Sequence, residues 1–187
     1  MRFTARHLLV LLVALLVVAG GAGVAVAGAP ASLRVSGPTD VDGTSATAVF
    51  QVGDRQVRQV RYRDKADLVY SFTLHNDGGL PVTVGGLAPL EREPRLFRYL
   101  TVEDASGHTR FTVPAGGRTD VRVRMRMESC ESLSARAGSF ATEAALRTTR
   151  AGFVDEVVTV TFPEEVHTGS PREAFCPEST AGSRPPG

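Results

Sequence analysis

Residues 67–76, DLVYSFTLHN, alternate between large apolar side chains and mostly polar ones. Successive side chains of a β-strand point to opposite faces, so the even-numbered residues from Leu68 to Leu74 would share one apolar face. Alternation of this kind is typical of half-buried strands in antiparallel sheets. The stretch therefore predicts a strand that covers a hydrophobic core with one face.

The same period of two continues downstream, where valines and methionines alternate with arginines over Val121–Met127. Turn sequences such as Asn76-Asp77-Gly78-Gly79 separate the predicted strands. The pattern predicts an all-β fold, an immunoglobulin-like Greek-key β-sandwich, with a small barrel as the alternative. The other expected strands are Phe140–Thr148, Val158–Phe162, Thr44–Val52, Val57–Tyr62, Leu80–Val84, Leu96–Val102 and Thr109–Val113.

The first thirty residues have the composition of an export segment. Arg2 and Arg6 precede an uncharged apolar stretch, which ends in small residues around Ala25-Val26-Ala27. As a cleaved signal peptide, its apolar core is Leu8–Val18; as an uncleaved anchor helix, Leu8–Ala29 reaches the about 20 residues that span a membrane. Both alternatives predict an extracytoplasmic protein, secreted or held at the outer face of the cytoplasmic membrane.

The predicted domain organisation has three parts: a signal peptide or anchor at residues 1–30, the sandwich at 31–177 and a disordered tail at 178–187. The whole chain carries 21 basic and 20 acidic side chains, for a net charge of +1. Such a balance gives no electrostatic reason to bind nucleic acid, so no nucleic-acid partner is expected. Membrane contact is expected only through the N-terminal segment, if it is not cleaved.

The chain has two cysteines, Cys130 and Cys176. In an oxidising compartment an even number of cysteines predicts a disulfide. The bond would close a loop of about 45 residues and contribute about 4 kcal/mol to stability in the chain-entropy model. A redox or metal-binding thiol pair is the alternative, but the sequence shows no Cys-x-x-Cys spacing and no histidine close to either cysteine.

Two segments carry a resemblance to a known group. In the first, a strand ends at Asn76-Asp77-Gly78 and the next begins Leu80-Pro81-Val82-Thr83-Val84; in the second, Pro114-Ala115-Gly116 leads into Val121–Met127 and Cys130. Over about residues 57–177 the chain resembles uncharacterised exported actinobacterial proteins with Ig-like β-sandwiches. The resemblance implies an Ig-like fold and a location in the cell envelope, and it implies no activity.

Three arginines form a strip on one face of a predicted strand: Arg122, Arg124 and Arg126, spaced about 6.6 Å apart. Arg58, Arg61 and Arg63 add positive charge earlier in the chain. The strip could contact an anionic glycan, a phospholipid or an acidic protein. Alternatively, its arginines pair with acidic side chains on neighbouring strands or guard an exposed sheet edge.

Thioether and imidazole ligands suit copper, so Met125 and Met127 with His75 and His108 are the candidate ligands of a copper site. Both methionines alternate with arginines, however, which places them in the core as gap-filling side chains. No metal site and no cofactor are therefore predicted.

The sequence also holds paired acidic residues, which could serve acid–base chemistry only if a pocket held them at a defined separation. They are expected at strand ends or in loops, where carboxylates are solvated, and no catalytic motif accompanies them. No catalytic residue and no enzymatic activity are predicted. These clusters are Glu91-Arg92-Glu93, Glu103-Asp104, Asp155-Glu156 and Glu164-Glu165.

The sequence thus predicts a non-enzymatic extracytoplasmic binding or scaffolding module of a bacterial envelope. Its partner would be an envelope protein or polymer, contacted through the arginine strip or the loop Leu87–Pro94. The alternative is a carrier of a small ligand or of copper, which would need a cleft between the sheets. An enzyme would need two carboxylates buried together in one cleft.

Overall fold

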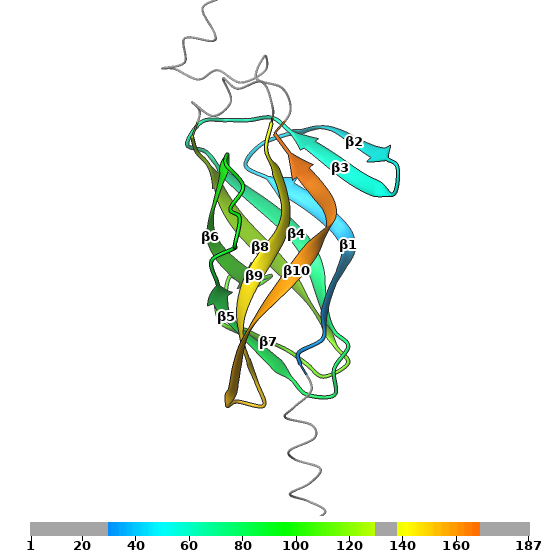
Figure 1. Ribbon diagram of the computed structural model, residues 1–187, viewed down its shortest axis with the longest axis vertical. Coiled ribbons are helices and arrows are strands. Elements are labelled where there is room, and N and C mark those ends of the chain that lie inside the picture. The colour runs from blue at the N-terminus through cyan, green and yellow to red at the C-terminus, as the bar shows by residue number, and fades with distance from the viewer. Residues whose placement is uncertain (1–29, 130–137, 169–187) are drawn as a thin grey trace, which may run out of the picture.

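The computed structural model describes residues 30–129 and 138–168. Within these ranges the chain is all-β, with strands arranged in two sheets that face each other (Figure 1). The predicted β-sandwich is confirmed, and the two separate sheets differ from the alternative of one closed barrel. The predicted N-terminal helix lies outside the described residues.

In the described chain, one sheet has four strands in the order β1-β4-β8-β6, and the other has six in the order β2-β3-β10-β9-β5-β7. All pairings are antiparallel except that of β3 with β10. The first sheet comprises β1 (Leu33–Asp42), β4 (Asp67–Asn76), β8 (Arg118–Met127) and β6 (Phe97–Asp104). The second comprises β2 (Ala46–Val52), β3 (Arg55–Val60), β10 (Val154–His167), β9 (Phe140–Arg150), β5 (Val82–Leu87) and β7 (Phe111–Val113).

The core lies between the sheets and follows the alternation of the sequence. Leu68, Tyr70, Phe72 and Leu74 are all buried, as are the valines and methionines of β8. The rings of Tyr70 and Phe72 contact the ring of Phe162 from β10, with centroids 5.0 and 5.6 Å apart. Burial of each such side chain stabilises the fold by about 1.5–3 kcal/mol. These aromatic rings therefore join the two sheets.

Strand β1 is the main departure from the predicted elements, since no strand was expected before Thr44. Val35 and Val41 pack against the core, but the pairing of β1 with β4 is irregular between Ser36 and Asp40. Pro38 lies inside this irregular segment and has no N–H to donate. The irregularity interrupts the period of two, which is why the sequence pattern did not indicate the strand.

Candidate functional site

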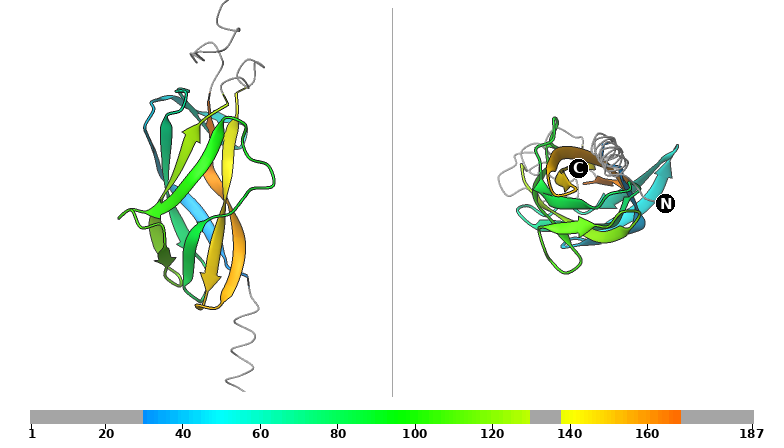
Figure 2. Two further views of the ribbon diagram at one scale, coloured as in Figure 1. Left: turned by 90° about the vertical axis from the view of Figure 1, so that its left-hand side faces the viewer. Right: turned by 90° about the horizontal axis from the view of Figure 1, so that it is seen from below.

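The most exposed element of the described chain is the hairpin formed by β2 and β3. A two-residue turn at Gly53-Asp54 joins the strands, and Gly53 has a φ of 61°. The hairpin projects from the body in Figure 1 and again in the end-on view of Figure 2. All residues of β2 are exposed, and Val49, Phe50 and Val52 keep 41–46% of their surface accessible. The exposed side chains of β2 make the hairpin suited to a contact.

The hairpin also presents a free backbone edge, because β2 is the terminal strand of its sheet. A two-residue turn makes its flanking residues a hydrogen-bonded pair, so the N–H and C=O groups of Val52 point toward Arg55 of β3. Hydrogen-bonded pairs alternate along an antiparallel ladder, so the same groups of Phe50 also point toward β3. The N–H and C=O groups of Val49 and Gln51 then point away from β3. No described strand pairs with them. The open edge of β2 can therefore accept a further strand.

The other three sheet edges of the described chain are protected. Strand β1 has its irregular segment with Pro38 and the charged Asp40, and β6 is irregular between Tyr99 and Thr101 and carries Glu103. Strand β7 has only three residues. Irregular pairing, proline, charge and short length all discourage the addition of a strand. By contrast β2 has seven residues and no charged side chain, and its pairing with β3 is regular from Ala48 to Val52, with a register shift only between Ala46 and Ala48.

Strand β3 anchors the hairpin to the body. Its residues Val57–Gln59 form a short parallel ladder with Glu165–His167 of β10. Arg58 pairs with Glu164, and the two side chains are only 15% and 2% exposed. Arg58 Nη2 also donates to Thr39 Oγ1 of β1 at 3.1 Å. The guanidinium of Arg58 thus ties the hairpin to both sheets.

Tyr70 borders this ion pair inside the sandwich. Burial raises the pKa of Tyr70 above its usual range, and the negative charge of Glu164 raises it further. Tyr70 therefore stays neutral and adds no charge to the buried pair. The expectation that Glu164 is solvated is wrong. Strand β10 continues through the acidic cluster, so Glu164 shares the inward face with Phe162 and Val166.

The structure places Arg122, Arg124 and Arg126 together on the outer face of the four-stranded sheet. Arg126 Nε donates to Asp67 Oδ1 at 2.8 Å, and Arg124 lies 3.8 Å from Asp67 and 3.5 Å from Glu103. The hydrogen bond from Arg126 lowers the pKa of Asp67. Arg122 makes no ion pair with any described residue. Two arginines therefore pair with neighbouring strands, and binding of an anionic partner by the strip stays a prediction.

The loop Leu87–Pro94, which the sequence predicts as a contact surface, borders a hollow of about 440 Å³ between β6 and the start of β9. Tyr99 forms part of its wall and donates a hydrogen bond to the carbonyl of Glu143 at 2.7 Å. The lining mixes arginines, glutamates and apolar side chains, which points to no single class of ligand. From the segment Leu87–Pro94 it includes Leu90, Arg92, Glu93 and Pro94.

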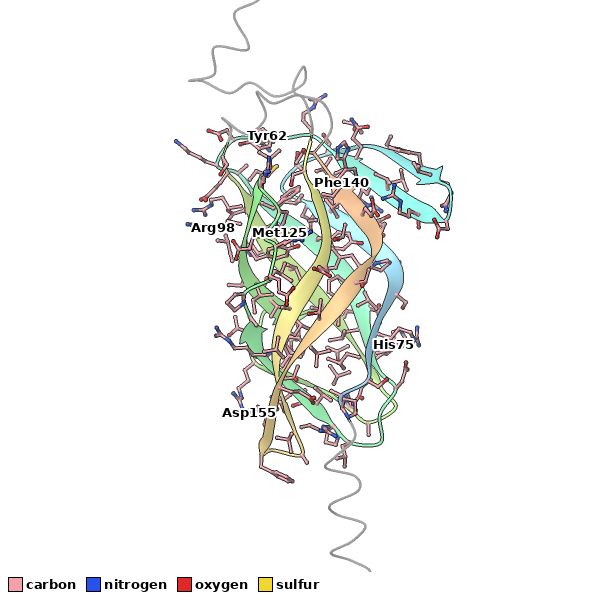
Figure 3. The ribbon with its side chains drawn as sticks, viewed as in Figure 1. Tyr62, His75, Arg98, Met125, Phe140 and Asp155 are labelled. Atoms are coloured by element: carbon pink, nitrogen blue, oxygen red, sulfur yellow. The ribbon has the colours of Figure 1, made fainter. Side chains whose placement is uncertain are left out.

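The structure does not bring the four residues of the copper hypothesis together. Met125 and Met127 are fully buried, whereas His75 contacts Ser36 Oγ on the outer face and His108 pairs with Asp104. Figure 3 shows Met125 within the body and His75 well apart from it. Within residues 30–129 and 138–168, no group of three or more histidine, cysteine or acidic side chains is arranged to hold a metal ion.

Several predictions fall outside the described residues. Cys130 and Cys176 both do, so their disulfide stays a prediction. The apolar stretch Leu8–Ala29 does so too. In the part of the chain that is described, no helix has the length and apolar character needed to cross a membrane.

Comparisons with known proteins add little. No protein-family model matches the chain, and no curated protein matches it. A solved structure, the cupredoxin domain of amoB from Nitrosocaldus yellowstonii, is similar at 11% sequence identity and a TM-score of 0.28. The match covers 60% of this chain and 65% of that chain. Similarity at this level supports no inference about function, and the resemblance to exported actinobacterial proteins stays a prediction.

Proposed function

We propose that this chain is a non-enzymatic, extracytoplasmic binding or scaffolding module whose contact element is the hairpin β2–β3. The observation that carries the proposal is the exposure of every residue of β2, a terminal strand without charge. A free strand edge binds by accepting a strand from a partner, with main-chain hydrogen bonds providing affinity and side chains providing specificity. The apolar segment at residues 8–29 supports the location outside the cytoplasm.

The sandwich is proposed to be of the immunoglobulin-like Greek-key type. The order β1-β4-β8-β6 corresponds to strands A-B-E-D of that fold, and β10-β9-β5 corresponds to G-F-C. Domains of this architecture serve many unrelated functions, so the fold alone assigns none. The proposal for function therefore depends on the hairpin.

A photo-crosslinking amino acid at Phe50 tests the proposed function in living cells. Phe153 provides the matched control, because it is 72% exposed and lies in the turn between β9 and β10. That turn is at the opposite end of the body from the hairpin (Figure 1). We expect a covalent protein adduct from position 50 and none from position 153. No adduct from position 50, or identical adducts from both positions, would contradict the proposal.

A further inference from the structure

We propose that the strand accepted by β2 is the β2 strand of a second copy of this chain. The two copies would be related by a two-fold axis at Phe50, which joins two six-stranded sheets into one continuous sheet. This inference rests on the proposed function, because it uses the same hairpin and names its partner.

The backbone groups of β2 are self-complementary under this symmetry. Val49 and Gln51 have the N–H and C=O groups that point away from β3. An antiparallel two-fold axis at Phe50 places Val49 of one copy opposite Gln51 of the second copy, and the reverse. Each such pair can exchange two hydrogen bonds, as residues with facing backbone groups do in antiparallel ladders. The register therefore uses the free groups of both copies.

The side chains match in the same register. Phe50 would lie opposite the second copy's Phe50, and Ala48 would lie opposite its Val52. Cross-strand aromatic and aliphatic pairs stabilise antiparallel ladders, and like charges placed opposite each other destabilise them. Because β2 carries no charged side chain, two identical strands can meet without repulsion.

The lack of charge also favours a second copy over a foreign strand. Interfaces select a particular partner through complementary charges and through repulsion of wrong partners. From Ala46 to Val52 the strand has no charged side chain, so it can neither attract a partner by complementary charge nor repel a wrong one by like charge. A two-fold contact, in contrast, covers both free edges at once and closes the assembly. Within the described sheets, the protected edges at β1, β6 and β7 then leave no comparable site for further strands.

The shape of the molecule permits this contact. The hairpin extends beyond the body in two perpendicular views (Figures 1 and 2), so its edge is not shielded by the described strands. When two copies pair through the free edges of their β2 strands, the two sandwiches would lie on opposite sides of the paired hairpins. The exposed Phe50 and Val52 would then be partly covered by the partner hairpin.

Variants that place opposite charges at Phe50, the residue on the proposed two-fold axis, test the inference. Phe50→Lys and Phe50→Glu each place like charges opposite each other, so we expect each variant of the purified full chain to dimerise at least about tenfold more weakly than the wild type. An equimolar mixture should recover the dimer, because lysine then faces glutamate. Sedimentation equilibrium measures the association, and Phe153→Lys should dimerise like the wild type.

Phe50 is exposed, so both variants should keep the wild-type melting temperature when measured as monomers. A wild-type chain that stays monomeric at high micromolar concentration would overturn the inference. So would a mixture of the two folded variants that does not recover the dimer. If position 50 instead crosslinks a different envelope protein while the wild type is monomeric, the proposed function stands and this inference fails. If the mixture of charged variants recovers the dimer in solution but position 50 gives no adduct in cells, the pairing of β2 with a second copy stands and the proposed function in cells fails.

Discussion

Replacement of Arg58 by methionine tests whether the buried ion pair holds the hairpin to the sandwich. The Glu164 side chain is 2% exposed, so removal of the guanidinium would leave a carboxylate without its cation inside the protein. Breaking a buried ion pair in this way costs about 3–5 kcal/mol of stability. In a domain of this size, that cost corresponds to a fall in melting temperature of about 10–15 °C.

The assay is thermal unfolding followed by circular dichroism at pH 7, with Arg55→Met as the matched control. Arg55 lies on the same strand and pairs with Glu165 at 3.0 Å, but its side chain is 57% exposed. Exposed pairs contribute about 0–1 kcal/mol, so the control should remain close to the wild type. The double variant Arg58→Met/Glu164→Leu should regain most of the loss, because no buried charge remains. Equal effects of Arg58→Met and Arg55→Met, or a double variant no better than the single one, would refute this reasoning.

Three further predictions concern other parts of the molecule. Burial lowers the pKa of His167, so the unfolded chain binds the proton more readily below about pH 6.5. The stability that neutral His167 provides is therefore present above that pH and lost as the pH falls, and melting temperatures at pH 7 and 5 should differ less in His167→Gln than in the wild type. Gly43→Ala should lower the urea midpoint strongly, since a Cβ there would lie 2.0 Å from the carbonyl oxygen of Asp67 and the φ of 85° disfavours alanine. Reduction of the predicted Cys130–Cys176 bond should lower the free energy of unfolding by about 4 kcal/mol, and alkylation of the native protein that detects free thiols would exclude the bond.

The regular strands could be predicted because their one-sided burial leaves a period of two in the sequence. Strand β4 has the bounds Asp67–Asn76 that the alternation indicates, and its inward residues are buried. Strand β1 escaped because its irregular segment shifts the pattern between Ser36 and Asp40. A local pattern reports the face of a strand only while the pairing is regular.

The candidate site could not be predicted because it depends on distant pairings. Arg58 and Glu164 are 106 positions apart, and nothing near either residue marks it as buried. In the sequence, the adjacent Glu164 and Glu165 are typical of the solvated end of a strand. Likewise, the uncharged sequence of β2 suits a central strand as well as a terminal one. Only the pairing of β3 with β10 leaves β2 at the end of its sheet.

The buried anchor and the open edge belong to one arrangement. A two-stranded hairpin in water samples many conformations, and a contact that orders it would lose affinity to that entropy. Arg58 lies on β3 opposite Val49 in the register of the hairpin, while its side chain reaches Glu164 and Thr39 in the body. The attachment therefore acts at the centre of the hairpin and restricts its motion. Because β2 itself makes few contacts with the body, its edge stays free while β3 holds it in place. A held, uncharged strand with one free edge is thereby preorganised to add to another.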